Sequence, residues 1–92
     1  MRLVDAIRDL TLLDKEATIY AAPPWTVESE AMVAREPDDQ ILPCDAEVRG
    51  LKYFLEVILA RELLEDLEAS LDTEPTLKQK CEWVITYAMN DA

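Results

Sequence analysis

The chain has 92 residues, of which 20 are aspartate or glutamate and nine are lysine or arginine, so its formal net charge is −11 at pH 7. Such a charge repels nucleic acid and anionic membranes at long range and attracts basic protein surfaces. The sequence contains no histidine, so the commonest metal ligand and acid–base group is absent. The composition predicts an acidic protein-binding module that is not an enzyme, carries no metal or cofactor, and binds neither nucleic acid nor membranes.

Half of the residues are apolar and only one is glycine, so the chain can bury a core and is predicted to form a single domain, residues 1–92. Two cysteines, Cys44 and Cys81, are too few for the disulfide framework of a small secreted domain. We expect both to be reduced. No secretory signal and no apolar run of about 18 residues is present, so the expected location is the cytoplasm.

The first third of the chain predicts a helix followed by two strands. Residues 2–13 place apolar side chains at helical spacing, and residues 17–22 form a short apolar run that Pro23-Pro24 must end. A second apolar run, residues 30–35, follows the proline-rich loop at 23–29. These two runs predict a β-hairpin.

Beyond an acidic connection at residues 36–43, the spacing predicts one long helix from Asp45, its expected N-cap, to about Leu71. One apolar stripe repeats at intervals of four and three residues: Tyr53, Val57, Ala60, Leu64, Leu67 and Leu71. A second stripe follows another face: Val48, Leu51, Leu55 and Ile58. Gly50 is expected inside this helix, at a cost of about 1 kcal/mol relative to alanine.

A last helix is predicted after the break at residues 72–75. Thr76 and Gln79 have the spacing of a capping box, and Leu77, Cys81, Val84 and Ala88 continue an apolar stripe. The two final helices should fold back on each other. The predicted class is α+β in the order α-β-β-α-α, a small antiparallel β-hairpin packed on a helical layer with a C-terminal antiparallel αα-hairpin.

The predicted long helix carries four acidic residues near its end: Glu62, Glu65, Asp66 and Glu68. Three interpretations stay open for this face. It is an ordinary solvated surface, or it guides a basic partner, or Glu62 and Glu65 share a divalent cation. A cation site would require a second carboxylate pair on a facing helix, which the last helix hardly offers.

Three aromatic residues are candidate partner anchors. Trp83 and Tyr87 are four residues apart on the last helix, and Trp25 lies in the proline-rich loop. Large rigid side chains of this kind are frequent at interfaces. The alternative is that all three simply close a small core. No catalytic residue is predicted, since the scarce serines and Cys44 have no histidine to activate them.

Three segments carry a resemblance to a known group of proteins: residues 17–25 (ATIYAAPPW), residues 36–39 (EPDD) and residues 51–57 (LKYFLEV). Together they resemble a family of short acidic uncharacterised bacterial proteins, of the immunity-protein or mobile-element-cargo type. The resemblance covers most of the chain. It implies no chemistry, but it does imply a protein of the immunity or antitoxin class.

The leading hypothesis is therefore a small acidic module that neutralises or regulates a basic protein partner, in the manner of an immunity protein or antitoxin. The alternative is a self-associating structural or accessory protein. A homodimer is expected because the predicted long helix is apolar on nearly every side between Val48 and Ala60, including Phe54 and Leu59. Three small neighbouring elements could not cover all of these side chains.

Overall fold

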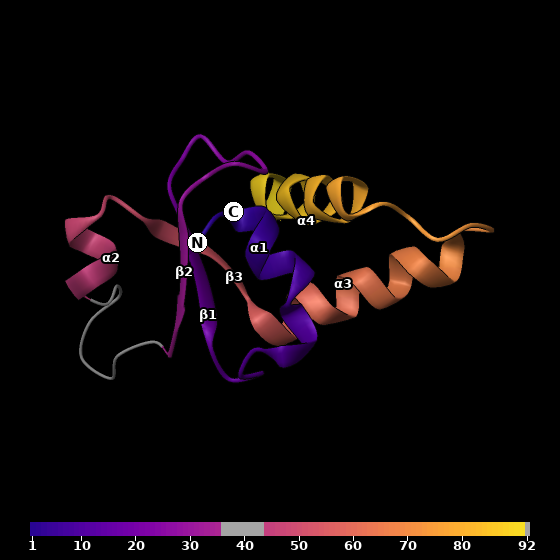
Figure 1. Ribbon diagram of the computed structural model, residues 1–92, viewed down its shortest axis with the longest axis horizontal. Coiled ribbons are helices and arrows are strands. Elements are labelled where there is room, and N and C mark those ends of the chain that lie inside the picture. The colour runs from indigo at the N-terminus through magenta and orange to yellow at the C-terminus, as the bar shows by residue number, and fades with distance from the viewer. Residues whose placement is uncertain (36–43, 92) are drawn as a thin grey trace.

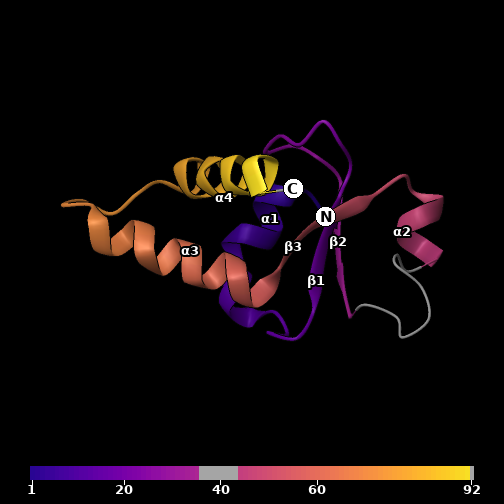
Figure 2. The same cartoon turned by 180° about the vertical axis from the view of Figure 1, so that it is seen from behind.

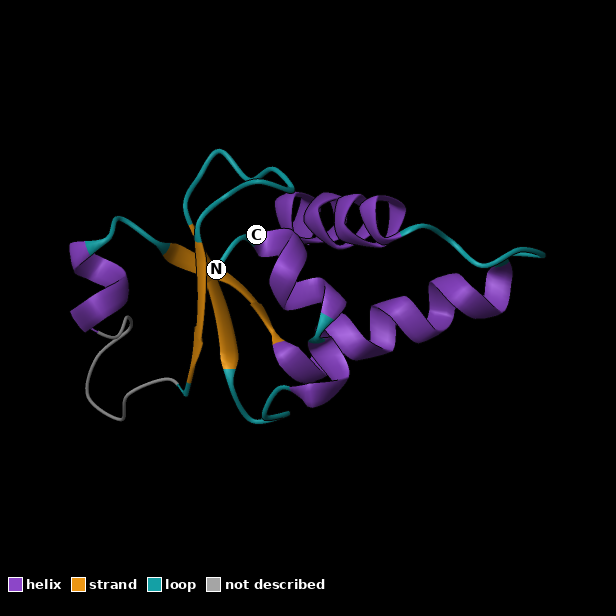
Figure 3. Cartoon of the chain, in the orientation of Figure 1, coloured by secondary structure: helices purple, strands orange, loops and turns teal. Residues whose placement is uncertain are grey.

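The computed structural model describes residues 1–35 and 44–91 (Figure 1). The described part is an α+β fold of helices and one antiparallel sheet, which confirms the predicted class (Figure 3). Its elements in chain order are α1 (Leu3–Arg8), the 3₁₀ helix η1 (Leu10–Leu12), β1 (Thr18–Ala21), β2 (Ala31–Ala34), α2 (Cys44–Val48), β3 (Lys52–Glu56), α3 (Val57–Ser70) and α4 (Leu77–Asp91). The connection predicted at residues 36–43 lies outside the described residues.

The predicted β-hairpin is confirmed. β1 pairs antiparallel with β2, with Thr18 opposite Ala34 and Ala21 opposite Ala31. The strands end where expected, because Pro23 and Pro24 follow β1 and cannot donate to a ladder. The sheet is nevertheless larger than predicted, since β3 pairs with the other edge of β1 and the strand order is β2-β1-β3.

The sheet is covered on both faces. Ile19 and Ala21 of β1 belong to the main core with α1, α3 and α4, whereas Tyr20 packs with Ala46 and Leu51 in a second, smaller core. In both views α2 lies on the far side of the sheet from the three other helices (Figures 1 and 2). Every residue of β1 is therefore buried, as expected for a central strand between two layers.

The prediction of one helix from Asp45 to Leu71 is wrong. α2 begins at Cys44, so Asp45 is not its N-cap, and a turn and β3 separate α2 from α3. Gly50 has a φ of 73°. Its N–H donates to the carbonyl of Glu47 at 3.2 Å, and the Leu51 N–H donates to the carbonyl of Ala46 at 2.8 Å. This pair of bonds is a Schellman motif, in which glycine ends a helix.

A β-bulge in β3 explains why its sequence suggested a helix. Tyr53 pairs with Tyr20 and Leu55 pairs with Ile19, so Phe54 is an extra residue on β3. Phe54 and Leu55 are consecutive and both are buried in the main core, which breaks the alternation typical of a strand. α3 then begins at Val57 without a side-chain cap, and the Val57 N–H donates to the carbonyl of Ala17 at 3.1 Å.

The C-terminal helices agree better with the prediction. Val57, Ala60, Leu64 and Leu67 are buried on α3, and Cys81, Val84, Ile85 and Ala88 are buried on α4. The capping box is confirmed, because the Thr76 N–H donates to Gln79 Oε1 at 2.8 Å and the Gln79 N–H donates to Thr76 Oγ1 at 3.1 Å. α4 folds back from the end of α3 towards the sheet (Figure 1).

The structural reason given for a dimer also changes. Phe54 and Leu55 are covered inside the monomer as part of β3, and Leu59 is half-buried against the main core. Val48, expected on an inner stripe, is 86% exposed at the end of α2. Self-association remains a prediction, but it no longer follows from an over-apolar helix.

Gly50 provides a test of this chain path. Gly50→Ala should lower the free energy of unfolding by about 1–2 kcal/mol, since an L-residue is strained in the left-handed region. Nothing lies within 4 Å of a Cβ added there, so the cost is conformational. Gly50→Asn should cost less, because asparagine tolerates this conformation. Urea unfolding measures both. If the segment were helical, Gly50→Ala would instead stabilise the protein by up to about 1 kcal/mol.

Candidate functional site

The four acidic residues predicted on the long helix lie on α3, and all are exposed. They occupy the sides of α3 that its buried residues, such as Leu64 and Leu67, do not. Glu62, Glu65 and Asp66 form no ion pair with any described residue, whereas Glu68 Oε1 lies 3.1 Å from Lys80 Nζ of α4. Three of the four predicted carboxylates are thus open to a partner.

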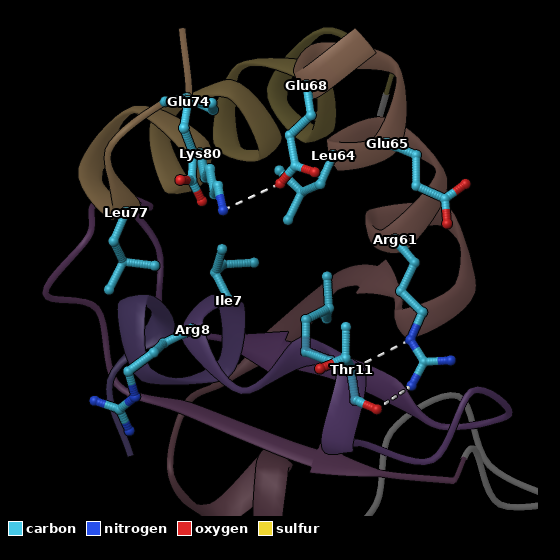
Figure 4. Close-up of a pocket in the computed structure, with 12 residues that line it drawn as sticks. Ile7, Arg8, Thr11, Arg61, Leu64, Glu65, Glu68, Glu74, Leu77 and Lys80 are labelled. Atoms are coloured by element: carbon cyan, nitrogen blue, oxygen red, sulfur yellow. Dashed lines mark hydrogen bonds and ion pairs between the residues drawn. The ribbon is translucent and has the colours of Figure 1, made fainter.

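Glu65 and Glu68 border a cavity of about 530 Å³ between α1, α3 and the start of α4 (Figure 4). Its lining is mixed in charge, with three acidic and three basic residues besides apolar ones: Ile7, Arg8, Leu10, Thr11, Arg61, Leu64, Glu65, Glu68, Glu74, Pro75, Leu77 and Lys80. The only hydroxyl in this lining is that of Thr11. The cavity is large enough to hold a small polar molecule.

Arg61 has a structural role that the sequence did not reveal. Its guanidinium group donates to the main-chain carbonyls of Leu10 and Thr11 in η1, at 3.2 and 2.9 Å (Figure 4), and to that of Leu13, which follows η1, at 2.9 Å. The last carbonyls of a helix lack partners within the helix, and a cation there is favoured. Arg61 therefore fastens α3 to the end of the first helical segment. The available signal was that Arg61 is the only basic residue in α3.

The three aromatic candidates differ in burial. Trp25 is half-buried, its ring meets Phe54 edge-on at a centroid distance of 4.9 Å, and its Nε1 donates to the Ala21 carbonyl at 3.1 Å. Trp25 therefore closes the edge of the core, as the alternative interpretation expected. Tyr87 is also half-buried against the main core. Trp83, in contrast, is 46% exposed.

Cys81 is fully buried on the inner face of α4 and forms no disulfide. Burial, with a smaller contribution from Glu82, raises the pKa of its thiol to about 11. Its thiol is therefore protonated near neutral pH and poorly nucleophilic. Within residues 1–35 and 44–91 no three potential ligand side chains come together in a way that could hold a metal ion, and Glu62 and Glu65 have no facing carboxylate pair.

Removing the Arg61 side chain should destabilise the fold. Arg61→Ala removes three hydrogen bonds, of which, within the described residues, only the one to Leu10 is backed by a main-chain donor, the Leu13 N–H. We expect a loss of about 1–2 kcal/mol in the free energy of unfolding. The free energy of unfolding of Arg61→Lys should lie between those of the wild type and Arg61→Ala, because an ammonium group cannot reproduce the planar guanidinium fork. Arg35→Ala is the control, since Arg35 forms only exposed ion pairs with Asp14 and Glu16 and should matter less. Equal losses at both positions would contradict the role given to Arg61.

Cys81 should resist thiol reagents in the folded protein. With Cys44→Ser as background, at pH 8 about one Cys81 side chain in a thousand is a thiolate, compared with roughly a quarter in the unfolded chain. A thiol reagent should label Cys81 at least about 100-fold more slowly in the folded protein than in the protein unfolded in urea. Because folding raises this pKa, stability should fall as the pH rises from about 8.5 towards 11. Rapid labelling of folded protein would mean that α4 is turned the other way.

In the part of the chain that the structure describes, no helix combines the length and apolar character needed to cross a membrane. No protein-family model matches the chain, and neither does any curated protein or solved structure. The inference of function therefore depends on the charge and geometry of the molecule itself.

Proposed function

We propose that this protein is a small acidic binding module that neutralises or regulates a basic protein partner, in the manner of an immunity protein or antitoxin. The observation that supports it is the exposed carboxylate face of α3, formed by Glu62, Glu65 and Asp66, none of which forms an ion pair with a described residue. Hereafter these three residues are called the acidic face.

The distribution of basic residues explains why the acidic face is bare. Most of the lysine and arginine side chains already bind other groups of the protein. Within the described residues five form ion pairs, and Arg61 donates to main-chain carbonyls at η1. The ion pairs are Arg2 with Glu28, Arg8 with Asp5 and Asp9, Arg35 with Asp14 and Glu16, Arg49 with Glu30, and Lys80 with Glu68. The carboxylates of the acidic face have no ion-pair partner among the described residues, so they strengthen the negative electrostatic potential around α3. Such a field speeds the encounter with a basic surface and disfavours acidic competitors.

The function also needs rigid support for these carboxylates, and α3 supplies it. The helix is held to the core along Val57, Ala60, Leu64 and Leu67 and to η1 through Arg61. Because the backbone of α3 is already ordered, only the side chains of the acidic face lose conformational freedom on binding, which limits the entropic cost of association. We also propose that the protein acts in the cytoplasm.

Reversing charge on the acidic face should slow association with the partner. The partner is first captured from a bacterial lysate and purified, and its association rate is then measured by stopped flow across a salt series. We expect Glu62→Lys with Asp66→Lys to lower the rate at least about tenfold at low salt and to flatten its salt dependence.

The matched control is Glu47→Lys with Glu56→Lys, which changes the net charge equally. Both residues are exposed and neither forms an ion pair within the described residues. If the two double variants slow association equally, net charge alone matters and the acidic face has no special role. If no basic protein is captured at all, the proposed function is wrong.

A further inference from the structure

A shallow groove lies between the end of α3 and the outer side of α4. Leu67 of α3 and Leu71, the residue that follows α3, line it together with Pro75 and with Trp83 of α4, and its volume is about 330 Å³. Leu71 and Trp83 are 44% and 46% exposed. Hereafter it is called the α3–α4 groove. It places the exposed indole ring of Trp83 and the exposed side chain of Leu71 in one lining with the buried Leu67. Exposed apolar side chains around a hollow are typical of an anchor pocket in an interface.

Trp83 differs from Trp25 in a way that matters for binding. The Trp25 N–H is used within the fold, because it donates to the Ala21 carbonyl. The Trp83 N–H makes no hydrogen bond with any described residue, so both its ring face and its donor are available. A half-exposed tryptophan can gain buried area and a hydrogen bond together when a partner covers it.

The surroundings of the groove are acidic. At the end near the α3–α4 loop, Leu71 and Pro75 also line a depression with Glu68, Asp72 and Glu74. At the other end, Glu82 and Thr86 are shared with a depression beside Trp25.

No lysine or arginine lines the groove or either adjoining depression. The basic side chains of Arg8, Arg61 and Lys80 line the neighbouring cavity of Figure 4, which shares Pro75 with the groove and Glu68 and Glu74 with the acidic depression. Lys78 is exposed on α4 but lines neither the groove nor its two adjoining depressions. The chemistry of a complementary partner is therefore specific: an apolar side chain flanked by basic ones.

We propose that the α3–α4 groove holds a large apolar side chain of the basic partner, with flanking lysine or arginine side chains directed at Asp72, Glu74 and Glu82. The inference rests on the proposed function and assigns the contact that fixes the bound pose. A second copy of this chain fits poorly, since it would bring its own net charge of −11 against the same carboxylates.

The test uses a phage-displayed library of random peptides selected on the wild-type protein at about 0.15 M salt, where exposed charges are screened beyond roughly 8 Å. Selected sequences should combine lysine or arginine with at least one leucine, phenylalanine or tryptophan. Synthetic versions should bind Trp83→Ala and Leu71→Ser at least about 20-fold more weakly than wild type. Met89→Ala is the matched control, because Met89 is 62% exposed on the same helix and lines none of the three depressions.

Urea unfolding of each variant checks that the fold is kept. Each of the following outcomes would overturn the proposal for the groove. Peptides weakened by Glu62→Lys with Asp66→Lys but not by Trp83→Ala would overturn the groove and leave the proposed function standing. Selection of no basic peptide would count against both. Sedimentation equilibrium gives the remaining outcome: a wild-type dimer that Trp83→Ala dissociates would mean that a second copy covers the groove, and the inference would be wrong.

Discussion

The pairing of β3 with the second edge of β1 is the interaction on which the rest of the structure depends. A two-stranded hairpin is marginal in water, and a third strand gives the sheet enough surface to cover. β3 also determines where α3 starts, because Val57 follows it directly and donates its N–H to the Ala17 carbonyl. The direction of α3, and with it the position of α4, follows from this one strand pairing.

The sheet divides the apolar residues between two cores of unequal size. α1, α3 and α4 cover one face, and α2 with Leu51 covers Tyr20 on the other. Gly50 is essential to this division, because the reversal after α2 requires a positive φ, and Leu51 is then placed against Ala46 in the second core. A short helix ended by a Schellman motif thus closes the face that a hairpin would leave open to water.

The packing of α3 against its neighbours also determines which charged side chains have partners. Arg61 and Lys80 are directed towards η1 and Glu68, where they hold α3 to its neighbours. The carboxylates that remain on the outer side of α3 have no such partners. In the function we propose, long-range attraction by the acidic face and short-range selection by the α3–α4 groove would be physically different contributions, since the first is weakened by salt and the second depends on desolvation.

Local signals in the sequence determined the α+β class, the β-hairpin, the capped last helix and the exposure of the acidic residues on α3. In each case a nearby pattern was sufficient: Pro23-Pro24 after a strand, Thr76 with Gln79 at a helix start, and apolar residues spaced along α3 and α4. Tertiary structure alone decided the existence of β3, the role of Arg61 and the difference in burial between Trp25 and Trp83. The bulge at Phe54 removed the alternation that identifies a strand, and the spacing of Tyr53, Val57 and Ala60 continued a helical pattern across the boundary. Strand pairing and a guanidinium group reaching carbonyls some fifty residues away in the chain are long-range interactions, and no window along the sequence contains them.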